Sequence, residues 1–383
     1  MSQTILILGA GVGGLVAANE LRRALPKEHR VVVVNRENSF VFAPSFLWLI
    51  TGGRTAQKIS RPLLRLQRKG IEVIQGQIER IDPDRREAVV NGRTLAGDHM
   101  ILALGAELAP ETIPGLAQAG HNFYTLAGAE ALRDAFSAFD GGRIVVLTAT
   151  PAYKCPAAPY EAAMLLEYAS RKRKIRERTQ FDLYAAEPGP MGVAGPEVSK
   201  AVRQMVEAKG IAYYPEHQLA EVDPAMRRLK FANGIEADYD LLAYVPPHRP
   251  PRVVREAGLV GESGWMVVDR HSLATRFERV YALGDVVAIP LKLGKPLPKA
   301  GVFAEGQAQV IAKNIVRAIT GNGEPTAFDG EGECFIETGD GKAGFGKGNF
   351  YAEPVPQVKI QPPAYRWHAA KVLFEKYWLR HWF

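Results

Sequence analysis

The chain is poor in cysteine and has no long apolar run. Its 383 residues include two cysteines, Cys155 and Cys334, and no stretch approaches the roughly 20 apolar residues that span a bilayer. The N-terminus, MSQTILILGAGVGG, lacks the basic segment and cleavage site of a secretion signal. We therefore expect the catalytic part to stay in the cytoplasm. A structural disulfide is disfavoured there, so the cysteines are either inert core residues or a catalytic pair.

Nucleic-acid modules, low-complexity stretches and metal-ligand motifs are also lacking, so we predict no nucleic-acid partner and no metal. The formal net charge of +7 favours anionic partners, and acidic lipid becomes the leading candidate. With 47% hydrophobic and 23% charged residues, the chain can bury a large core. Its length predicts two domains and a small third region.

A dinucleotide-binding turn opens the chain. An apolar run at residues 4–8 is followed by GxGxxG, a helical stretch at 15–25 and a second apolar strand that ends at Val34. Glycines at these positions allow a tight turn and close approach to a pyrophosphate, and the helix N-terminus offers amide donors. The alternative is a chance glycine-rich turn. The expected pyrophosphate-binding positions are Gly9, Gly11, Val12, Gly13 and Gly14.

One residue departs from the dinucleotide pattern. The acid expected at the end of the second strand, where it would bind the ribose, is replaced by Asn35, followed by Arg36 and Glu37. Asparagine can still hydrogen-bond a hydroxyl group. We therefore still predict a dinucleotide site here, with Asn35 and Arg36 among its cofactor-binding residues.

Two further segments favour FAD at this first site. Residues 98–108, DHMILALGAEL, and 276–286, RFERVYALGDV, resemble the connecting strand and the second flavin motif of two-dinucleotide-domain flavoproteins. Asp285 is then expected on the ribityl or pyrophosphate side. Further predicted cofactor contacts are Pro44, Ile78, Ala103, Gly105 and Gly284.

The segment that follows Asp285 predicts another cofactor contact. A helix beginning near Gly301 would aim its positive end at the flavin edge that becomes negative on reduction. Lys299 would add to this stabilisation, and Gly301 and Val302 complete the predicted cofactor residues. The alternative is a core helix with a surface lysine.

A second strand unit begins at residue 141 but lacks the glycines. Its turn reads Thr148, Ala149, Thr150, Pro151, and proline and β-branched residues would keep the backbone from closing on a pyrophosphate. The fold therefore repeats, and the nicotinamide site is predicted to be lost.

Cys155 follows this turn and precedes a helix that begins near Pro159, with Glu161 in its first turn. Proximity to a helix N-terminus lowers the pKa of a cysteine, so we expect Cys155 to be a nucleophilic thiolate. Glu161 is the candidate proton acceptor.

The other cysteine, Cys334, lies in a predicted antiparallel hairpin or sheet. Phe335 beside it either fills the core of that sheet or walls a flat ring such as a quinone. The tail, residues 364–383, mixes basic residues with aromatics that include Trp367, Trp378 and Trp382. This mixture suits the membrane headgroup boundary. The alternative is a helix packed on the protein or on another subunit.

Five segments together resemble the sulfide:quinone oxidoreductases, and the match runs over essentially the whole chain. They are GAGVGGLVAANELR, CPAAPYE, PKAGVFAEGQA, CFIETG and WHAAKVLFEKYWL. The resemblance implies that Cys155 and Cys334 face the flavin and handle sulfur, and that Lys371 lies near the quinone. Many members have a third cysteine, which this chain lacks. With no cysteine before Cys155, FAD is expected to be non-covalent.

The predicted fold class is α/β, with two Rossmann-like domains and a C-terminal membrane-binding region. The predicted boundaries are 1–111 and 249–325 for the FAD domain, 112–248 for the second Rossmann-like domain, and 326–383 for the C-terminal region. The expected partners are sulfide, a membrane quinone, an anionic membrane surface and further copies of the chain. The protein is expected on the cytoplasmic side of the cell membrane as a peripheral protein.

Three other functions stay open at this point. A type II NADH:quinone dehydrogenase shares the fold, FAD and a membrane tail, but the missing second glycine motif opposes it. A sulfide dehydrogenase with a cytochrome acceptor shares the two-cysteine plan. A non-catalytic membrane flavoprotein would bind flavin that sulfide does not reduce.

Overall fold

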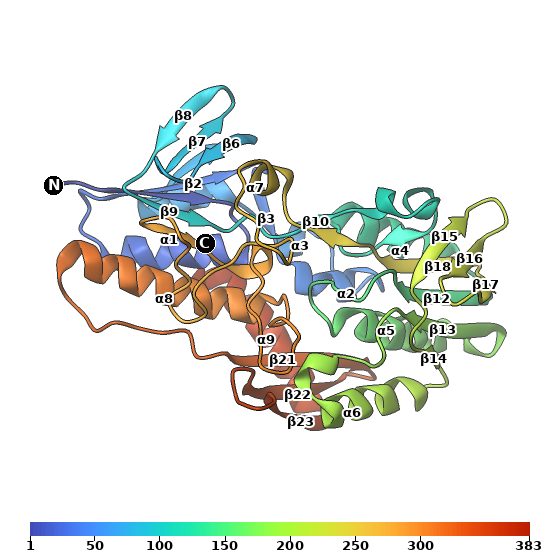
Figure 1. Cartoon of the computed structure of the whole chain (residues 1–383). Helices are drawn as coiled ribbons and strands as arrows, with labels where there is room; N and C mark the ends of the chain where they lie inside the picture. The colour runs from blue at the N-terminus through green and yellow to red at the C-terminus, as the bar shows by residue number, and fades with distance from the viewer.

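Two parallel sheets form the centre of the structure (Figure 1), a computed structural model that describes residues 1–383. The first sheet has the strand order β20-β9-β1-β2-β5, and all neighbouring strands are parallel. Its three inner strands are buried on both faces, as expected for a parallel sheet. They are β1 (Thr4–Leu8), β2 (Arg30–Asn35), β5 (Glu72–Gln75), β9 (His99–Leu102) and β20 (Val280–Ala282).

The second sheet repeats the first. Its order is β11-β18-β12-β13-β14, again parallel throughout. In chain order, β12, β13 and β14 correspond to β1, β2 and β5, so each sheet is built from the same crossover unit. The strands are β11 (His121–Asn122), β12 (Gly142–Thr148), β13 (Thr179–Ala185), β14 (Ala212–Tyr214) and β18 (Leu241–Val245).

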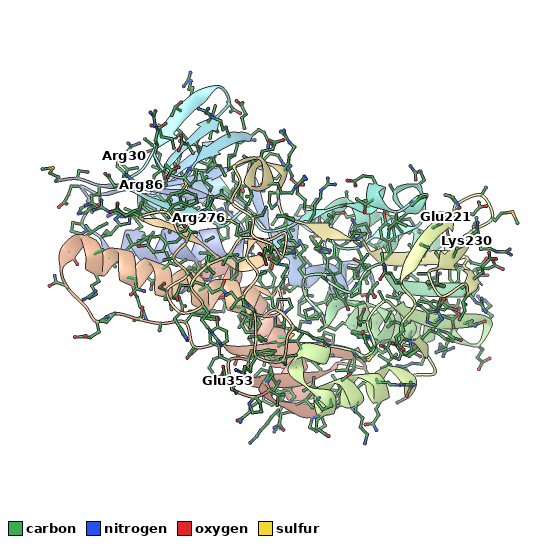
Figure 2. All side chains as sticks on the ribbon, viewed as in Figure 1. Arg30, Arg86, Glu221, Lys230, Arg276 and Glu353 are labelled. Carbon is green, nitrogen blue, oxygen red and sulfur yellow. The ribbon has the colours of Figure 1, made fainter.

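Each parallel sheet is accompanied by a three-stranded antiparallel meander. The first contains β6 (Ile78–Asp82), β7 (Glu87–Val90) and β8 (Arg93–Ala96), and the second β15 (Leu219–Asp223), β16 (Arg228–Phe231) and β17 (Glu236–Asp238). The meanders project to solvent with charged side chains such as Glu221 and Lys230 (Figure 2). The predicted α/β class with two Rossmann-like units is confirmed.

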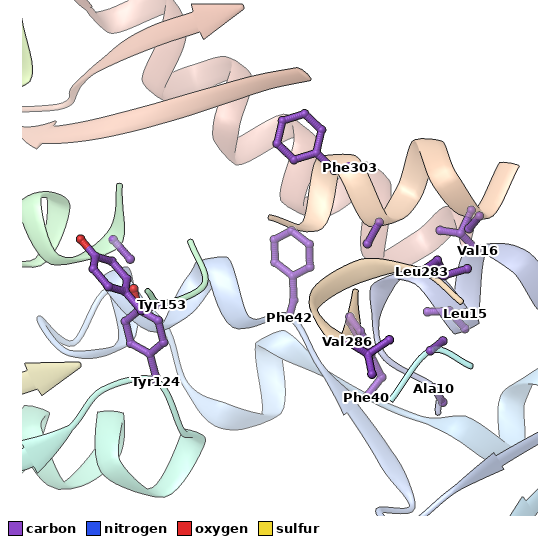
Figure 3. Close-up of a cluster of buried hydrophobic side chains, with 14 of the residues drawn as sticks. Ala10, Leu15, Val16, Phe40, Phe42, Tyr124, Tyr153, Leu283, Val286 and Phe303 are labelled. Carbon is purple, nitrogen blue, oxygen red and sulfur yellow. The ribbon is translucent and has the colours of Figure 1, made fainter. Parts of the chain in front are cut away.

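The helices cover the sheets and fill the space between the units. Helix α1 (Val12–Ala24) packs along α8 (Gly301–Thr320), and Phe303 near the start of α8 reaches the buried cluster in Figure 3. The second unit is covered by α4 (Leu126–Ala138), α5 (Ala158–Lys172) and α6 (Pro196–Glu207). Shorter helices are α2 (Phe46–Leu49), α3 (Ala56–Ile59) and α7 (Arg252–Glu256), with 3₁₀ turns η1 (Ala43–Ser45) and η2 (Leu63–Lys69).

Two short ribbons complete these units. Strand β10 (Glu107–Leu108) pairs antiparallel with β19 (His248–Arg249), so the two passages of the chain between the sheets lie side by side. Strand β3 (Ser39–Val41) pairs with β4 (Ser60–Pro62). The predicted boundary at 111/112 falls shortly after β10 and that at 248/249 falls within β19, and the division into domains stays a prediction.

A third sheet and the last helix form the C-terminal region. Strands β21 (Glu331–Gly339), β22 (Lys342–Asn349) and β23 (Gln357–Ala364) are antiparallel. Helix α9 (Tyr365–His381) packs against them. No helix of the structure has the length and apolar character needed to cross a membrane.

Helix α9 corrects part of the prediction for the tail. Trp378 is 1% and Trp382 3% exposed, and the Trp378 ring stacks on Phe40 at a centroid distance of 4.9 Å. These two tryptophans therefore belong to the core and do not face a membrane. The exposed side chains of the helix are others, among them Leu373 at 65% and Tyr377 at 58%.

The turn between β1 and α1 gives a stability test. A Cβ atom at Gly14 would lie 1.9 Å from the Gly9 carbonyl oxygen, whereas a Cβ at Gly11 meets no atom within 4 Å. Gly14→Ala is expected to displace the turn at a cost of about 1–3 kcal/mol, the usual cost of overpacking. Gly11→Ala is expected to leave the fold unchanged. Thermal unfolding of the two apoproteins checks this, and equal melting temperatures would contradict it.

Candidate functional site

Three helix N-termini meet beside the first sheet. Gly301 at the start of α8 faces Val12 at the start of α1, with 3.7 Å from a Cβ at Gly301 to Val12 Cγ2. The loop before α5 joins them, because the Cys155 N–H donates to the Lys299 carbonyl oxygen at 2.7 Å. None of the three helices has a side-chain cap. In α5 the first N–H, that of Ala158, is bonded to the Cys155 carbonyl, whereas the first N–H groups of α1 and α8 are left for a ligand, and the dipoles of these two helices favour an anion.

The predicted cofactor residues of the first unit gather around the β1–α1 turn. Gly9, with φ +102°, approaches Ala103 so closely that a Cβ would lie 2.4 Å from the Ala103 oxygen. Asn35 Oδ1 accepts from the Ala10 N–H at 2.9 Å and its amide donates to the Glu37 carbonyl. Asn35 therefore fastens the turn to the end of β2.

The remaining predicted cofactor residues lie on several elements. Gly105 and Gly284 have φ angles of +67° and +73°. Arg36 is exposed and pairs with Glu37. Pro44 is exposed in η1, and Ile78 is buried in β6.

These residues fit a bound FAD. The space above Gly11 is open, the helix ends are uncapped, and the half-buried Asp285 carboxylate has no ion-pair partner because the Lys299 ammonium donates to carbonyl groups instead. An anionic pyrophosphate satisfies the amides, and a ribityl hydroxyl suits a free carboxylate.

Lys299 is held more tightly than the sequence indicates. Its ammonium donates to the Asp285 and Val287 carbonyls at 2.7 and 2.8 Å and lies 3.5 Å from the centre of the Trp265 ring. Burial lowers the pKa of Lys299 to about 8, against a smaller opposing effect of Asp285. Lys299 is therefore not a surface lysine, and its contact with the flavin stays a prediction.

The corresponding place in the second unit is filled by the protein itself. After β12, the Ala149 N–H donates to the Val245 carbonyl, and the Thr148 hydroxyl donates to Glu187 at 2.8 Å. The Tyr153 and Tyr160 hydroxyls also donate to Glu187. Glu187 follows β13, where an acid would bind a nucleotide ribose, and its acceptors are taken by these three hydroxyls.

Cys155 stands in a constrained loop just before α5. Its φ is +51°, a conformation that side-chain-bearing residues rarely adopt, and its carbonyl accepts from the Ala158 N–H and the Tyr124 hydroxyl. Together with the N–H bond to Lys299, these contacts hold the backbone in place. Such strain is typical of functional positions.

Cys334 and Phe335 lie on opposite faces of β21, because successive side chains of a strand alternate. The Phe335 ring lies 5.1 Å from that of Phe345 and 6.4 Å from that of Phe374 on α9. Phe374 also lies 6.1 Å from Phe42. Phe335 is therefore part of an aromatic group on the α9 side of the sheet, while Cys334 faces the other side.

A buried ion pair links the two cysteine segments. Lys371 Nζ on α9 donates to Glu161 Oε1 on α5 at 2.5 Å, with side-chain exposures of 8% and 3%. The same carboxylate oxygen accepts from the Glu337 N–H on β21 at 2.8 Å. The charges of Glu161 and Lys371 act on both sulfurs, and the charge of Cys155 acts on Cys334. Cys155, Cys334, Glu161 and Lys371 therefore form one cluster, here called the cysteine cluster.

The pKa values in this cluster correct the prediction for Cys155. Burial, reinforced by the Glu161 carboxylate, raises the pKa of Cys155 to about 12, although Lys371 and the Ala158 N–H act in the opposite direction. Burial likewise raises the pKa of Cys334 well above its usual range. The expected thiolate was wrong because desolvation outweighs the helix N-terminus. Both residues are free thiols in this structure.

In the Glu161–Lys371 pair, the attraction between the two charges opposes the effect of burial on both pKa values. Burial raises the pKa of Glu161, and Lys371 together with the Glu337 N–H counteracts this effect. Burial would lower the pKa of Lys371, but Glu161 and Glu337 outweigh it and the net shift is upward.

Several residues of this region were missed from the sequence. Glu337 is 1% exposed and contacts His368, while Trp48 lies under Lys371 with 5.3 Å from Nζ to the ring centre. Glu375 is buried and pairs with Arg54 at 2.8 Å. One signal was present: His368, Lys371, Glu375, Trp378 and Trp382 recur at helical spacing of three and four residues.

Comparison with known proteins agrees with this geometry. The family model of the pyridine nucleotide-disulphide oxidoreductases matches residues 3–308. The sulfide-quinone reductase of Aquifex aeolicus is 29% identical over 99% of this chain and 91% of that protein. The mitochondrial sulfide:quinone oxidoreductase of Mus musculus is 22% identical over 92% of this chain and 79% of that protein.

A solved structure gives the same result in three dimensions. The crystal structure of the Aquifex aeolicus sulfide:quinone oxidoreductase superposes with a TM-score of 0.90 at 26% identity, covering 99% of this chain and 91% of that one. The resemblance found in the sequence, the flavoenzyme class and FAD as cofactor are confirmed. The chain belongs to the pyridine nucleotide-disulphide oxidoreductase family.

Proposed function

We propose that the protein is a sulfide:quinone oxidoreductase. The observation that carries the proposal is the cysteine cluster, in which two thiols share one buried Glu161–Lys371 pair, in a chain whose helices α1 and α8 have open N-termini. The similarity to the Aquifex aeolicus sulfide-quinone reductase over 99% of the chain supports the same activity.

In this proposal Cys155 and Cys334 carry the sulfur. Hydrosulfide attacks a Cys155–Cys334 disulfide, whose S–S bond breaks to leave a persulfide on one cysteine and a thiolate on the other. A second hydrosulfide removes the outer sulfur as hydrogen disulfide, HSS⁻, and leaves one cysteine as a thiol and the other as a thiolate. Loss of two electrons restores the disulfide, and overall two hydrosulfides yield one hydrogen disulfide, one proton and two electrons. FAD, when bound, accepts these electrons and transfers them to a quinone.

The remaining residues of the cluster have distinct roles. Glu161 takes the proton that leaves a thiol, and Lys371 offsets the charge of the thiolate that remains, since its ammonium lowers the pKa of both thiols. Because burial raises both pKa values, the reduced pair is not stabilised as thiolate, and this makes it a good electron donor.

The quinone in this proposal enters from the α9 side. Phe335, Phe374 and Phe42 supply flat apolar walls there, and Lys371 supplies a cation at their inner end. The proposal keeps Phe335 and Lys371 as quinone contacts. The FAD in this proposal is non-covalent. A thioether link to the flavin would need a cysteine early in the chain, and no cysteine precedes Cys155.

Helix α9 suits the edge of a membrane because its outer face combines apolar side chains with the exposed Arg366, Lys376 and Arg380. Lys371 and Glu375 face inward, whereas Leu373, Phe374 and Tyr377 are 65%, 40% and 58% exposed. Exposed apolar side chains are costly in water, and apolar and basic side chains on one face are both favourable at an acidic lipid boundary. We propose a peripheral, cytoplasmic-side attachment to anionic membrane through this face.

A second element extends the same face. The Lys69 ammonium at the end of η2 donates to the His381 carbonyl at 3.0 Å, so η2 lies beside the end of α9. Leu64 of η2 is 60% exposed and is flanked by Arg61, Arg65 and Arg68. An apolar tip ringed by cations favours an acidic lipid surface.

The sulfur step is tested by replacing each cysteine with serine. Cys155→Ser and Cys334→Ser are expected to abolish the bleaching of the flavin band by sulfide in anaerobic stopped-flow absorbance, because neither variant can form the disulfide. Both are expected to retain FAD and to be reoxidised by a soluble quinone after dithionite reduction. Normal bleaching in both variants would falsify the dithiol mechanism, and bleaching by NADH in the native protein would favour the dehydrogenase alternative.

The raised thiol pKa predicts a pH-dependent alkylation. Cys155 has a pKa of about 12, so the reduced protein is expected to react with iodoacetamide slowly at neutral pH and faster as the pH rises toward that value. Glu161→Gln removes a charge that raises this pKa and shifts the reaction to lower pH. Lys371→Met removes a charge that lowers it and shifts the reaction to higher pH. Mass spectrometry measures both rates, and shifts of the same sign would contradict the assignment.

Membrane attachment is tested by sedimentation with vesicles that contain phosphatidylglycerol. Leu373→Glu and Tyr377→Glu are each expected to weaken binding about tenfold or more, because each loses about 1.5–3 kcal/mol of apolar burial. Met226→Glu is the matched control, since Met226 is 62% exposed on the β15–β16 turn of the second unit. An equal loss in the control, or none in the α9 variants, would place the membrane contact elsewhere.

A further inference from the structure

A second buried carboxylate contacts the cysteine cluster from the solvent side. His368 Nδ1 lies 3.0 and 3.1 Å from the two carboxylate oxygens of Glu337. The His368 side chain is 34% exposed, whereas that of Glu337 is only 1% exposed. The pair therefore connects solvent to the interior at the start of α9. Histidine is the side chain best suited to exchange a proton near neutral pH.

Glu337 is coupled to the inner ion pair in two ways. Its N–H donates to Glu161 Oε1 at 2.8 Å, on the same oxygen that accepts from Lys371. Its carboxylate raises the pKa of both Glu161 and Lys371. His368 and Lys371 are three residues apart on α9 and so face the same side. The two carboxylates and the ammonium thus share one buried environment.

The other charged groups around His368 are already paired. The Trp48 ring lies edge-on to the His368 ring at 6.1 Å, with Arg54 over the same indole at 4.4 Å. Arg54 is bound to Glu375, which also accepts from the Ser45 hydroxyl at 2.5 Å. Trp48 separates this pair from His368. The groups left to exchange a proton with His368 are Glu337 and, behind it, Lys371 and Glu161.

The proposed reaction needs a proton from solvent. Reduction of a quinone to the quinol consumes two electrons and two protons, whereas oxidation of one hydrosulfide to sulfane sulfur releases two electrons and one proton. One proton per turnover must therefore come from the medium. A buried lysine beside the quinone can donate a proton only if it is reprotonated.

We propose that His368 and Glu337 form the outer half of a proton path that reprotonates the Lys371–Glu161 pair during quinone reduction. The proton passes from solvent to His368, then to the Glu337 carboxylate and on to the Lys371–Glu161 pair, from which Lys371 donates it to the quinone oxygen. His368 and Glu337 act through Lys371 and are positioning residues of the reaction. This inference rests on the proposed function.

The oxidative half-reaction isolates this path. FAD in the holoenzyme is reduced with dithionite, and its reoxidation by a soluble quinone is followed by stopped flow across pH in H₂O and D₂O. His368→Asn keeps a hydrogen-bond donor near the Nδ1 position but cannot relay a proton, and Glu337→Gln keeps the size of the side chain. Both are expected to slow reoxidation about tenfold or more, with the loss growing as the pH rises and a larger solvent isotope effect. Added imidazole is expected to restore part of the rate in His368→Asn.

His381→Asn is the matched control, because His381 is an exposed histidine at the end of the same helix. Its reoxidation is expected to be unchanged. A native pH profile and isotope effect in both test variants overturn the proposal, and so does a slower rate without a change in either quantity, which would mean a structural role. Because dithionite replaces sulfide, failure of the native protein to react with sulfide would count against the proposed function and leave this test valid.

Discussion

The buried ion pair between Glu161 and Lys371 holds together the part of the molecule where the chemistry is proposed. It joins α5 to α9, and the Glu337 N–H adds β21 to the same oxygen. Desolvating two charges is expensive, so such a pair persists only when its hydrogen bonds are satisfied, and removing one partner of a buried pair costs about 3–5 kcal/mol. The pair is therefore a constraint that three separate elements must meet at once.

The same pair sets the electrostatics of the two sulfurs. Glu161 opposes a thiolate and Lys371 favours one, so their effects on each cysteine have opposite sign. Burial then decides the balance in favour of the neutral thiol. A change in the charge of this pair during turnover would shift the pKa values of both thiols in the same direction. Proton transfer would thereby be coupled to the sulfur chemistry without any movement of the backbone.

Local patterns in the sequence predicted the fold well. The β1–α1–β2 unit, the start of α8 at Gly301 and the antiparallel strands around Cys334 all lie where the spacing of glycine and apolar residues indicated. Helix α5 begins at Ala158, next to the predicted Pro159. These features depend on neighbours within a few turns of chain, and such neighbours are visible in a sequence.

The charges of the site could not be predicted in the same way. The ion pair joins residues 210 positions apart, and the Cys155 pKa depends on burial by elements from the whole chain. The tail was misjudged because Trp378 and Trp382 were counted with the aromatics that face lipid, whereas helical spacing puts them on the same side as Lys371 and Glu375. Which side of α9 is buried depends on its packing partners, such as Phe40 and Glu161, and composition alone does not reveal them.

The two Rossmann-like units explain why sulfur and not hydride would be the electron source. Both have a turn after their first strand, but in the second unit this turn continues into the loop that carries Tyr153 and Cys155. Tyr153 closes on Glu187, while Cys155 is fastened to Lys299 in the loop before α8. The turn that binds a nucleotide pyrophosphate in this fold thus continues here into a cysteine loop, whose backbone is bonded to the segment before α8 of the first unit. Since this turn has no glycines and Glu187 accepts from three protein hydroxyls, the second unit opposes a nicotinamide and agrees with the proposed sulfur donor.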